Sequence, residues 1–469
     1  MSSLTILLGL DALHGLPRDS HLLLATRAVR LFAYGTIGIF LALYLKRLGF
    51  TDTQIGLFLS LTLAGDAVLS FVVSANADHL GRRLMLVAGA ILMTISGAAF
   101  ATVDLFVKGA PLFWALTALG VIGVISPSGN EVGPFMPVEQ SILSNSVSFE
   151  KRTSLFAYYA FLGALATAGG SFTAGWLVQF LSQGPWQIPI LSAYRIVIST
   201  YAVLGIVLFA LFCCVSSNVE IERGTDEERA RLVDNAAAGQ GSAAGAEEVV
   251  AQNGAGAAEV GAAAANVASR RPGRGFYVRP ESRKIVVTMC ALFALDSFGS
   301  GAVTASWVSY WLNSRFGVEE GHLGTILSTA NIIAAISSLF SGAVARRLGL
   351  VNTMVFTHLP ANVFVLLLPF SPNLPTASAL IWLRYSMSQM DVAPRQAYIA
   401  SVVAPEDRTT VLGLCNLAKT VGNCLGPLLT GVLAESGMFD AAFWVGGGVK
   451  IVYDLLIWWR LKRVSGDAR

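Results

Sequence analysis

The stretch Leu84–Val107 reads LMLVAGAILMTISGAAFATVDLFV, which is long and apolar enough to cross a lipid bilayer as a helix. It lacks the strict alternation of apolar and polar residues that indicates a half-buried strand. Eleven more stretches share this character, so the 469-residue chain is predicted to contain twelve transmembrane helices. In order, the predicted spans are Leu22–Leu45, Gln54–Ala77, Leu84–Val107, Leu112–Leu143, Ser154–Leu181, Tyr194–Val215, Lys284–Leu312, Leu323–Ala345, Val351–Pro369, Ala377–Ser401, Val411–Ser436 and Ala442–Leu461.

The composition agrees with a membrane protein. Hydrophobic residues make up 54% of the chain and charged residues 13%, and the mean hydropathy is +0.63; soluble domains carry about 25% charged residues. The five cysteines lie in apolar runs without zinc-ligand spacing. The sequence contains no phosphate-binding glycine loop with Lys and Ser/Thr and no nucleophile elbow. We therefore expect neither an enzyme nor a bound cofactor or metal.

Lysines and arginines gather in alternate loops, and such loops face the cytoplasm. This rule predicts that both termini are cytoplasmic. Separately from the rule, we expect the plasma membrane rather than an internal one. The basic loops contain Arg82–Arg83, Lys151–Arg152, Arg270–Arg271, Arg346–Arg347, Arg408, and Arg460 with Lys462 and Arg463; the exceptions are Lys46, Arg47, Lys108, Arg195 and Arg315.

The spans fall into two groups of six around one hydrophilic segment. Its centre is rich in Ala and Gly and has too few bulky apolar residues to form a core. The predicted organisation is a cytoplasmic N-terminus (1–21), a six-helix bundle (22–215), a flexible cytoplasmic linker (216–283), a second six-helix bundle (284–461) and a cytoplasmic tail (462–469).

The two groups of spans are related by an internal repeat. Glu150-Lys151-Arg152-Thr153 recurs 256 residues later as Glu406-Asp407-Arg408-Thr409. Repeats of this kind are typical of secondary transporters, which bind substrate between the two halves near mid-membrane. The offset of 256 also pairs Gln140 with Gln396, Gly170 with Gly426 and Gly175 with Gly431, and an offset of 268 pairs Gly49 with Gly317, Gly56 with Gly324 and Gly81 with Gly349.

The loop after the second span, SANADHLGRR at 74–83, resembles the signature loop of the major facilitator superfamily. Asp78, Gly81, Arg82 and Arg83 fit that signature, whereas Ser74, Asn76 and His79 depart from it. The resemblance implies an all-α membrane protein with two pseudo-symmetric six-helix bundles that works by alternating access. It also implies that charges in this loop hold the cytoplasmic side shut, although Arg82 and Arg83 could serve topology alone.

A set of candidate gating residues follows from this loop and from the repeat. Asp78 can accept hydrogen bonds from the N-terminus of a neighbouring helix, with Arg152 as a charge partner. Glu139 and Arg395 are related by the offset of 256, so we expect them to pair across the cavity as a gate; alternatively, Glu139 reaches the interface. The gating set is Asp78, Gly81, Arg82, Arg83, Glu139, Arg152, Arg395 and Arg408.

Ionisable residues inside spans cost at least about 2.5–3.5 kcal/mol each and indicate functional sites. In the fourth span, prolines and glycines break the helix beside Asn130 and Glu131. In the tenth, Arg384, Asp391 and Arg395 share one face, and Asp391 can pair with Arg395 four residues on. The predicted substrate or coupling residues are Asn130, Glu131, Asp296, Arg384, Gln389, Asp391, Lys419 and Asp66.

Low dielectric raises the pKa of a carboxyl group, so Asp66, Glu131 or Asp296 could bind and release protons. Each could instead be neutralised by a structural cation such as Lys419 or Arg384. His358, in a span that is usually peripheral in the superfamily, is expected to be structural.

The favoured hypothesis is proton-coupled efflux of a drug-like compound or metabolite, because the segment Gly413–Leu417 and the following Gly426-Pro427 resemble exporters of the superfamily. One alternative is an uptake symporter for a polar or anionic solute, which Arg384, Arg395 and Lys419 would favour. Another is a sensor or scaffold that transports nothing. The expected partners are membrane lipid, a small-molecule substrate and protons, without nucleic acid, and we expect a monomer.

Overall fold

The structure is a computed structural model that describes residues 16–123, 125, 135–147, 149–216, 219–220, 280–392, 394–395, 398 and 408–466. Nearly all of these residues are helical. The first half contains α2 (Arg18–Gly38), α3 (Leu41–Arg47), α4 (Asp52–Leu80), α5 (Arg82–Phe106), α6 (Ala110–Ile122), α7 (Phe135–Asn145), α8 (Phe149–Gln183) and α9 (Ile190–Cys213). The second half contains α12 (Pro280–Ala302), α13 (Ala305–Phe316), α14 (Glu320–Leu348), α15 (Leu350–Leu367), the short η3 (Leu368–Phe370), α16 (Leu374–Met387), α18 (Arg408–Glu435) and α19 (Phe439–Gly466).

The predicted all-α membrane fold is confirmed, and the helices follow the order of the twelve predicted spans. Within the described residues, nine helices are long and apolar enough to cross a membrane, or ten if α2 and α3, which are bent by 41°, form one span. The predicted fourth span corresponds to the shorter α6 and α7, and the tenth begins with the shorter α16. Several helices extend beyond their predicted apolar cores; α14, for example, begins at Glu320 rather than Leu323.

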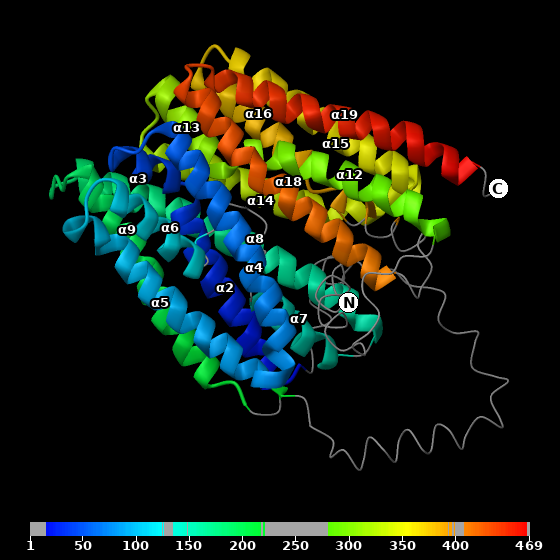
Figure 1. The fold of residues 1–469 in the computed structure, drawn as a ribbon, viewed down its shortest axis with the longest axis horizontal. Helices are drawn as coiled ribbons and strands as arrows, with labels where there is room; N and C mark the ends of the chain where they lie inside the picture. Colours follow the sequence, from blue (N-terminus) through cyan, green and yellow to red (C-terminus); the bar gives the residue numbers. More distant parts are fainter. Residues whose placement is uncertain are drawn as a thin grey trace.

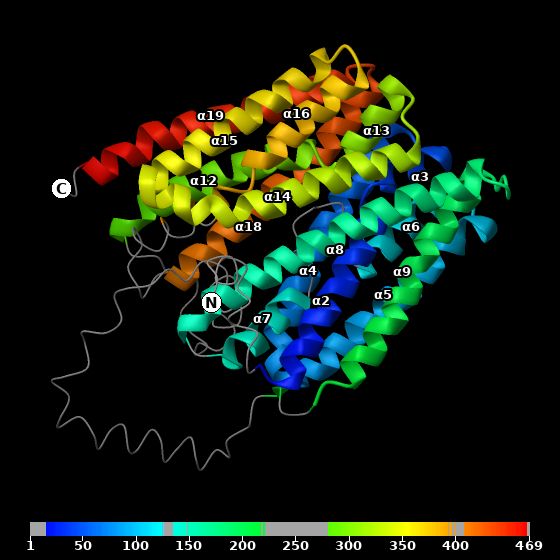
Figure 2. The same cartoon turned by 180° about the vertical axis from the view of Figure 1, so that it is seen from behind.

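The two halves form two bundles that lie at an angle to each other (Figures 1 and 2). The bundles converge where α3 lies beside α13, and they diverge toward the end of α9 and the start of α12. We call these regions the far end and the linker end. Between the bundles, α4 packs along α18 and α8 packs along α14.

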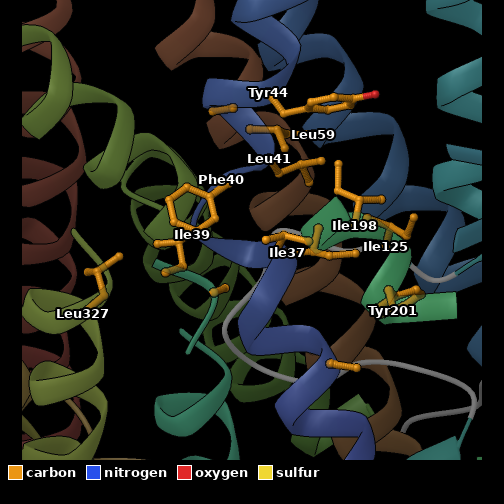
Figure 3. Close-up of a cluster of buried hydrophobic side chains, with 14 of the residues drawn as sticks. Ile37, Ile39, Phe40, Leu41, Tyr44, Leu59, Ile125, Ile198, Tyr201 and Leu327 are labelled. Atoms are coloured by element: carbon orange, nitrogen blue, oxygen red, sulfur yellow. The ribbon is translucent and has the colours of Figure 1, made fainter. Parts of the chain in front are cut away.

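The core of the first bundle surrounds the break between α2 and α3 (Figure 3). Phe40 and Tyr44 are buried there beside Leu59 of α4 and Ile198 of α9. A break in a transmembrane helix frees backbone groups that need partners. One freed group, the carbonyl of Gly38, accepts a hydrogen bond from the Ser306 hydroxyl of the second bundle. The break therefore supplies a contact between the halves.

Glycines of the predicted repeat build the seam between the bundles twice. A Cβ atom on Gly56 would lie 2.5 Å from the carbonyl oxygen of Pro427, and one on Gly324 would lie 2.7 Å from that of Ser171. Gly56 and Gly324 are equivalent under the offset of 268, and Pro427 and Ser171 under the offset of 256. The α4–α18 and α8–α14 contacts are therefore two copies of one packing arrangement.

Turn glycines repeat in the same way. Gly81 and Gly349 have φ angles of +105° and +82°, and Gly49 and Gly317 have φ angles of +91° and +62°. Positive φ is readily adopted only by glycine. The pairs that the repeat predicted thus share one backbone requirement.

Candidate functional site

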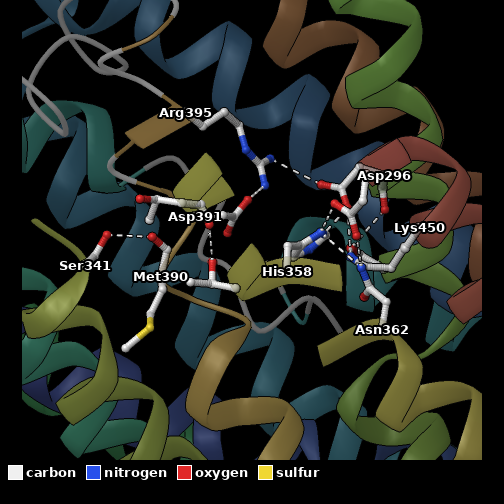
Figure 4. Close-up of polar contacts among 12 residues, drawn as sticks. Asp296, Ser341, His358, Asn362, Met390, Asp391, Arg395 and Lys450 are labelled. Atoms are coloured by element: carbon white, nitrogen blue, oxygen red, sulfur yellow. Dashed lines mark hydrogen bonds and ion pairs between the residues drawn. The ribbon is translucent and has the colours of Figure 1, made fainter. Parts of the chain in front are cut away.

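Asp296 of α12 is the centre of a buried ionic network in the second bundle (Figure 4). Its carboxylate is 4% exposed and lies between two cations. Lys450 of α19 donates to its Oδ1 at 2.9 Å, and Arg395 donates to its Oδ2 at 3.2 Å. Lys450 also donates to the Ser300 hydroxyl at 2.6 Å. Asp296 is thus paired with structural cations, which was the alternative to a proton carrier, but these cations are Lys450 and Arg395 and not Lys419 or Arg384.

Arg395 joins Asp296 to the segment that follows α16. Its guanidinium donates to the carboxylate of Asp391 as well as to that of Asp296. The predicted pair between Asp391 and Arg395, four residues apart, is thus confirmed. Through Arg395 this segment is tied to α12, so movement of one strains the other.

A second branch of the network runs through α15. His358 lies with its Nδ1 2.8 Å from Oδ1 of Asp454 on α19 and with its Nε2 3.7 Å from Oδ1 of Asp296. Asn362 donates to Oδ2 of Asp454 at 2.8 Å. His358 is therefore part of the ionic network and not an isolated packing residue. We call Asp296, His358, Asn362, Asp391, Arg395, Lys450 and Asp454 the C-bundle network.

The burial of this network makes its pairing important. All seven side chains are buried, and breaking one partner out of a buried ion pair costs about 3–5 kcal/mol. Counting only these seven residues, with His358 neutral, three carboxylates face two cations, Arg395 and Lys450, which leaves one negative charge. Lys419 of α18 lies outside these ion pairs but also attracts Asp296 and Asp391. An additional positive charge would therefore be held favourably within the network.

Two further cations lie in the second bundle without such pairing. Lys419 of α18 sits over the ring of Phe293 at 5.0 Å, and Arg384 of α16 sits over the ring of Tyr385 at 5.4 Å. Both are half-buried, and neither forms an ion pair with another described residue. Gln389 is also half-buried in this region. These groups remain available to a charged or polar ligand.

The first bundle has its own buried carboxylate, Glu139 of α7. Its Oε2 accepts from Arg30 at 2.7 Å and from the Tyr159 hydroxyl at 2.6 Å, and its Oε1 accepts from Thr26 at 3.2 Å. Arg27 covers the Tyr159 ring at 3.7 Å and donates to its carbonyl. Glu139 thus links α2, α7 and α8.

Glu139 and Arg395 do not contact each other in this structure, contrary to our expectation from the repeat. Each has ionic partners in its own bundle: Arg30 for Glu139, and Asp296 and Asp391 for Arg395. Equivalence under a pseudo-twofold places residues at matching positions, but their partners are set by neighbouring helices that do not match in charge. Any gating role of either residue acts through these pairs.

The linker-end loop is capped by a residue that the sequence analysis missed. The backbone N–H groups of Arg82 and Arg83, at the start of α5, donate to the Glu220 carboxylate at 2.7 and 3.0 Å. A carboxylate at a helix N-terminus satisfies free N–H groups and complements the helix dipole. Gly81, with its positive φ, allows the close approach, and the Arg83 guanidinium donates to the carbonyl of Cys213 at 2.7 Å.

The remaining predicted residues are less informative. Asp66 is buried in α4, and Arg152 is half-buried in α8. Residues 130 and 131 and most of the predicted linker (221–279) lie outside the described residues, as do the side chains of Asp78 and Arg408. The roles assigned to these groups stay predictions.

The far end is sealed by two matching sets of contacts between the bundles. The N–H of Thr53, in the first turn of α4, donates to the Glu435 carboxylate of α18 at 2.9 Å. The N–H of Gly321, in the first turn of α14, donates to the Gln179 amide oxygen of α8 at 3.0 Å. Thr53 and Gly321 are equivalent under the offset of 268, and Gln179 and Glu435 under the offset of 256.

Tyrosines complete this far-end seal in the same paired manner. The hydroxyl of Tyr310 donates to Asp52 at 2.9 Å, and that of Tyr194 donates to Glu320 at 2.9 Å. Asp52 and Glu320 are again equivalent under the offset of 268. Each acid accepts its hydrogen bond from the opposite half of the chain. The far end is thus closed by hydrogen bonds as well as by close helix packing.

Lys450 and Asp454 were also missed by the sequence analysis, although a signal was present. They are charged residues four apart inside the last predicted span, the same spacing as Asp391 and Arg395. Asn362 and Tyr159 give no comparable signal, since polar residues of these types are common in membrane helices and only the fold shows what they contact.

Comparison with known proteins agrees with this architecture. The family model for the Major Facilitator Superfamily matches residues 23–389 and 289–469. The chain is 29% identical over 446 residues to the uncharacterized membrane protein YJR124C of Saccharomyces cerevisiae, covering 94% of this chain and 93% of the relative. It is 24% identical over 165 residues to the uncharacterized MFS-type transporter YceJ of Bacillus subtilis, covering 35% and 41% of the two chains.

Solved structures show the same fold at low sequence identity. The xylose transporter XylE from E. coli, in a partially occluded inward-open conformation, has a TM-score of 0.65 at 14% identity, covering 94% of this chain and 97% of that one. The nucleoside transporter NupG has a TM-score of 0.65 at 12% identity, covering 94% and 98%. The chain therefore belongs to the major facilitator superfamily.

Proposed function

We propose that this protein is a proton-coupled secondary transporter that exports a drug-like compound or metabolite by alternating access. The observation that carries the proposal is the C-bundle network, in which charged groups from α12, α15, α19 and the segment after α16 meet inside the membrane. Ionisable groups at such depth are costly and are typical of substrate and proton pathways. Transport, and not catalysis, is the activity that this arrangement supports.

The conformation supports alternating access. Contacts between the bundles close the far end at both seams, whereas the bundles diverge toward the linker end (Figures 1 and 2). If the basic loops face the cytoplasm, as the positive-inside rule predicts, this is an inward-facing state. In this orientation both chain termini and the linker are cytoplasmic.

Coupling is proposed to act through the tie between α12 and the segment after α16. Asp296 holds Arg395 in this conformation. A change of charge in the network would change the strength of that tie, and so the balance between the two faces. We also propose three coupling or substrate residues because their polar side chains lie inside predicted membrane spans: Asp391, Gln389 and Asp66. We propose that the linker end is stabilised by Gly81, Arg82 and Arg83, which Glu220 caps, and by Arg152.

Transport by proteoliposomes tests this proposal. Liposomes carrying the purified protein would be offered a mixture of sugars, nucleosides, organic anions and hydrophobic amines under a pH gradient of either direction, and the lumen would be analysed by mass spectrometry. We expect accumulation of at least one compound class that collapses with the gradient and is lost in Asp296→Asn. Asp440→Asn, at the half-exposed far-end pair with Arg315, is the control. If no compound moves under either gradient, the proposal is wrong and a sensor becomes the better hypothesis.

Uptake of an anionic solute is the second candidate. It is favoured by Lys419 and Arg384, which lie half-buried in the second bundle without a carboxylate partner among the described residues. Carboxylates and phosphates bind such cations with charge-assisted hydrogen bonds. The same proteoliposome experiment separates the candidates, because uptake would accumulate organic anions with an inward proton gradient and would be lost in Lys419→Gln.

A further inference from the structure

The hydrogen bonds of His358 determine where its proton lies. Nδ1 of His358 is 2.8 Å from Oδ1 of Asp454. Two bare acceptors repel each other at this distance, so a hydrogen lies between them. The amide nitrogen of Asn362 lies 3.1 Å from the same Nδ1 and donates to the other oxygen of Asp454 at 2.8 Å. We assign the hydrogen of Nδ1 to the shorter contact, which is the one with the Asp454 carboxylate. With Asp454 ionised and accepting from Asn362, the neutral imidazole carries its hydrogen on Nδ1 and directs it at Asp454.

This assignment leaves Nε2 without a hydrogen in the neutral ring. Nε2 faces Oδ1 of Asp296 at 3.7 Å, and both atoms are buried, with His358 3% and Asp296 4% exposed. Two acceptors that face each other in a low-dielectric environment repel. One added proton converts this repulsion into attraction, because an imidazolium would lie between two carboxylates.

We propose that Nε2 of His358 is the binding site of the coupling proton, held between Asp454 and Asp296. This assignment rests on the proposed function, because a bound proton has a coupling role only in a transporter. The ligand is a single proton taken from water, and no bond other than N–H forms. The network, which carries one more negative than positive charge when His358 is neutral, becomes balanced when the proton binds.

Asp296 is a poorer proton carrier than His358, although the sequence analysis favoured it. Two cations, Lys450 and Arg395, already donate to its two oxygens and favour the charged carboxylate. Protonating Asp296 would leave both cations without their anion. Protonating His358 instead adds a third cation that shares Asp296 with them.

Other groups around His358 define what the proton would change. From α19 it meets Asp454 and the Tyr453 ring, whose centroid is 5.9 Å away, and on its own helix it meets Asn362. From α12 it faces Asp296, whose Oδ1 also accepts from Lys450. Arg395 and Asp391 form the next layer. An imidazolium competes with Lys450 for Oδ1 of Asp296 and weakens the hold of Asp296 on Arg395. Proton binding therefore loosens the tie between α12 and the segment after α16.

The test is nitrogen-15 magnetic resonance of the full chain, labelled at histidine and embedded in lipid. We expect one imidazole that is Nδ1–H when neutral, becomes doubly protonated on acidification, and is missing from His358→Gln. His322→Gln is the control, since His322 is 59% exposed at the far end beside Glu319. A His358 signal that is Nε2–H, or that stays neutral throughout acidification, overturns the assignment.

A transport measurement separates failure of this assignment from failure of the proposed function. With the solute found in the proteoliposome screen, His358→Gln is expected to keep exchange of solute across the membrane without a gradient. Accumulation driven by a pH gradient should fall at least about fivefold in this variant. Fivefold is the lower limit of typical coupling between two sites. If gradient-driven accumulation survives in His358→Gln, the proton site is wrong, whereas the proposed transport function stands. If the wild type shows no transport, the proposed function fails, and the titration alone decides whether His358 binds the proton.

Discussion

At the scale of single residues, the pairing within the C-bundle network sets the cost of each substitution. Lys450→Met would leave Asp296 with one cation in place of two. We expect this variant to lose about 3–5 kcal/mol of stability, as for other broken buried ion pairs. Adding Asp296→Asn should recover much of the loss, because the uncompensated charge disappears. Thermal unfolding in detergent measures both effects.

A surface pair provides the control for that comparison. Arg315 and Asp440 lie 3.2 Å apart with side chains 38% and 34% exposed. Arg315→Met should cost no more than about 1 kcal/mol. If Lys450→Met were equally mild, or the double variant were worse than the single one, the pairing seen around Asp296 would not govern stability.

The partners of Glu139 and Arg395 predict the outcome of a charge swap. Glu139→Arg would place a cation beside Arg30, and Arg395→Glu would place an anion beside Asp296 and Asp391. We therefore expect the double swap to transport no better than either single variant. Counterflow in proteoliposomes measures this, and recovery in the double swap would show instead that the two residues pair directly in another state.

The sequence predicted which residues are ionised inside the membrane better than it predicted their partners. Asp391 and Arg395 could be paired in advance, since helical geometry places residues four apart on one face. The partners of Asp296 come from α19 and from the segment after α16, more than ninety residues away, and no local pattern encodes such contacts. His358 was expected to be structural, and its place in the ionic network could not be predicted without the position of Asp454.

At the scale of helices, the seam glycines control closure of the far end. A methyl group on Gly56 would lie 2.5 Å from the carbonyl oxygen of Pro427, so Gly56→Ala must push α4 away from α18. Overpacking of this kind costs about 1–3 kcal/mol, which corresponds to a shift of roughly 5-fold to 150-fold toward the state open at the far end. A cysteine at Ser60, whose hydroxyl accepts from the Leu428 N–H at 3.0 Å across the seam, should become more reactive to a maleimide.

A matched glycine elsewhere controls for the effect of adding a methyl group to a helix. Gly448 of α19 has no atom within 4 Å of the position that a Cβ would occupy. Gly448→Ala should leave the reactivity of the Ser60→Cys reporter unchanged and should stabilise α19 by up to about 1 kcal/mol. Equal reactivity in Gly56→Ala and Gly448→Ala would show that the close packing at Gly56 does not control closure of the α4–α18 seam.

The helices themselves were predictable because a lipid-facing helix only has to be apolar and long enough. The break between α2 and α3 was not predicted, since Gly38 and Phe40 are compatible with a continuous helix; the free carbonyl of Gly38 is instead stabilised by Ser306 of the other bundle. The repeat gave the equivalence of Gly56 with Gly324 but not their partners. Those partners, at Pro427 and Ser171, depend on how the bundles face each other.

At the scale of the whole molecule, alternating access requires the far-end seal to open once in each cycle. The Trp176 indole donates to the Thr325 hydroxyl at 3.1 Å across the α8–α14 seam, so cysteines at these two positions can be joined by a short, reducible thiol cross-linker. In a background without the five native cysteines, cross-linking should hold the protein in the conformation seen here. Transport should stop on cross-linking and recover when the cross-link is reduced.

This prediction separates a rocking motion from other ways of moving solute. The joined protein should still admit solute from the linker end, so binding measured there should persist while counterflow is lost. Each single cysteine variant should transport normally after treatment with the cross-linker, which excludes a direct effect of the reagent. Because the far-end contacts occur as two equivalent sets, fixing one seam should prevent the other from opening. If the fully cross-linked protein continued to transport, the bundles would not need to separate at the far end, and the divergence at the linker end would have to be explained without alternating access.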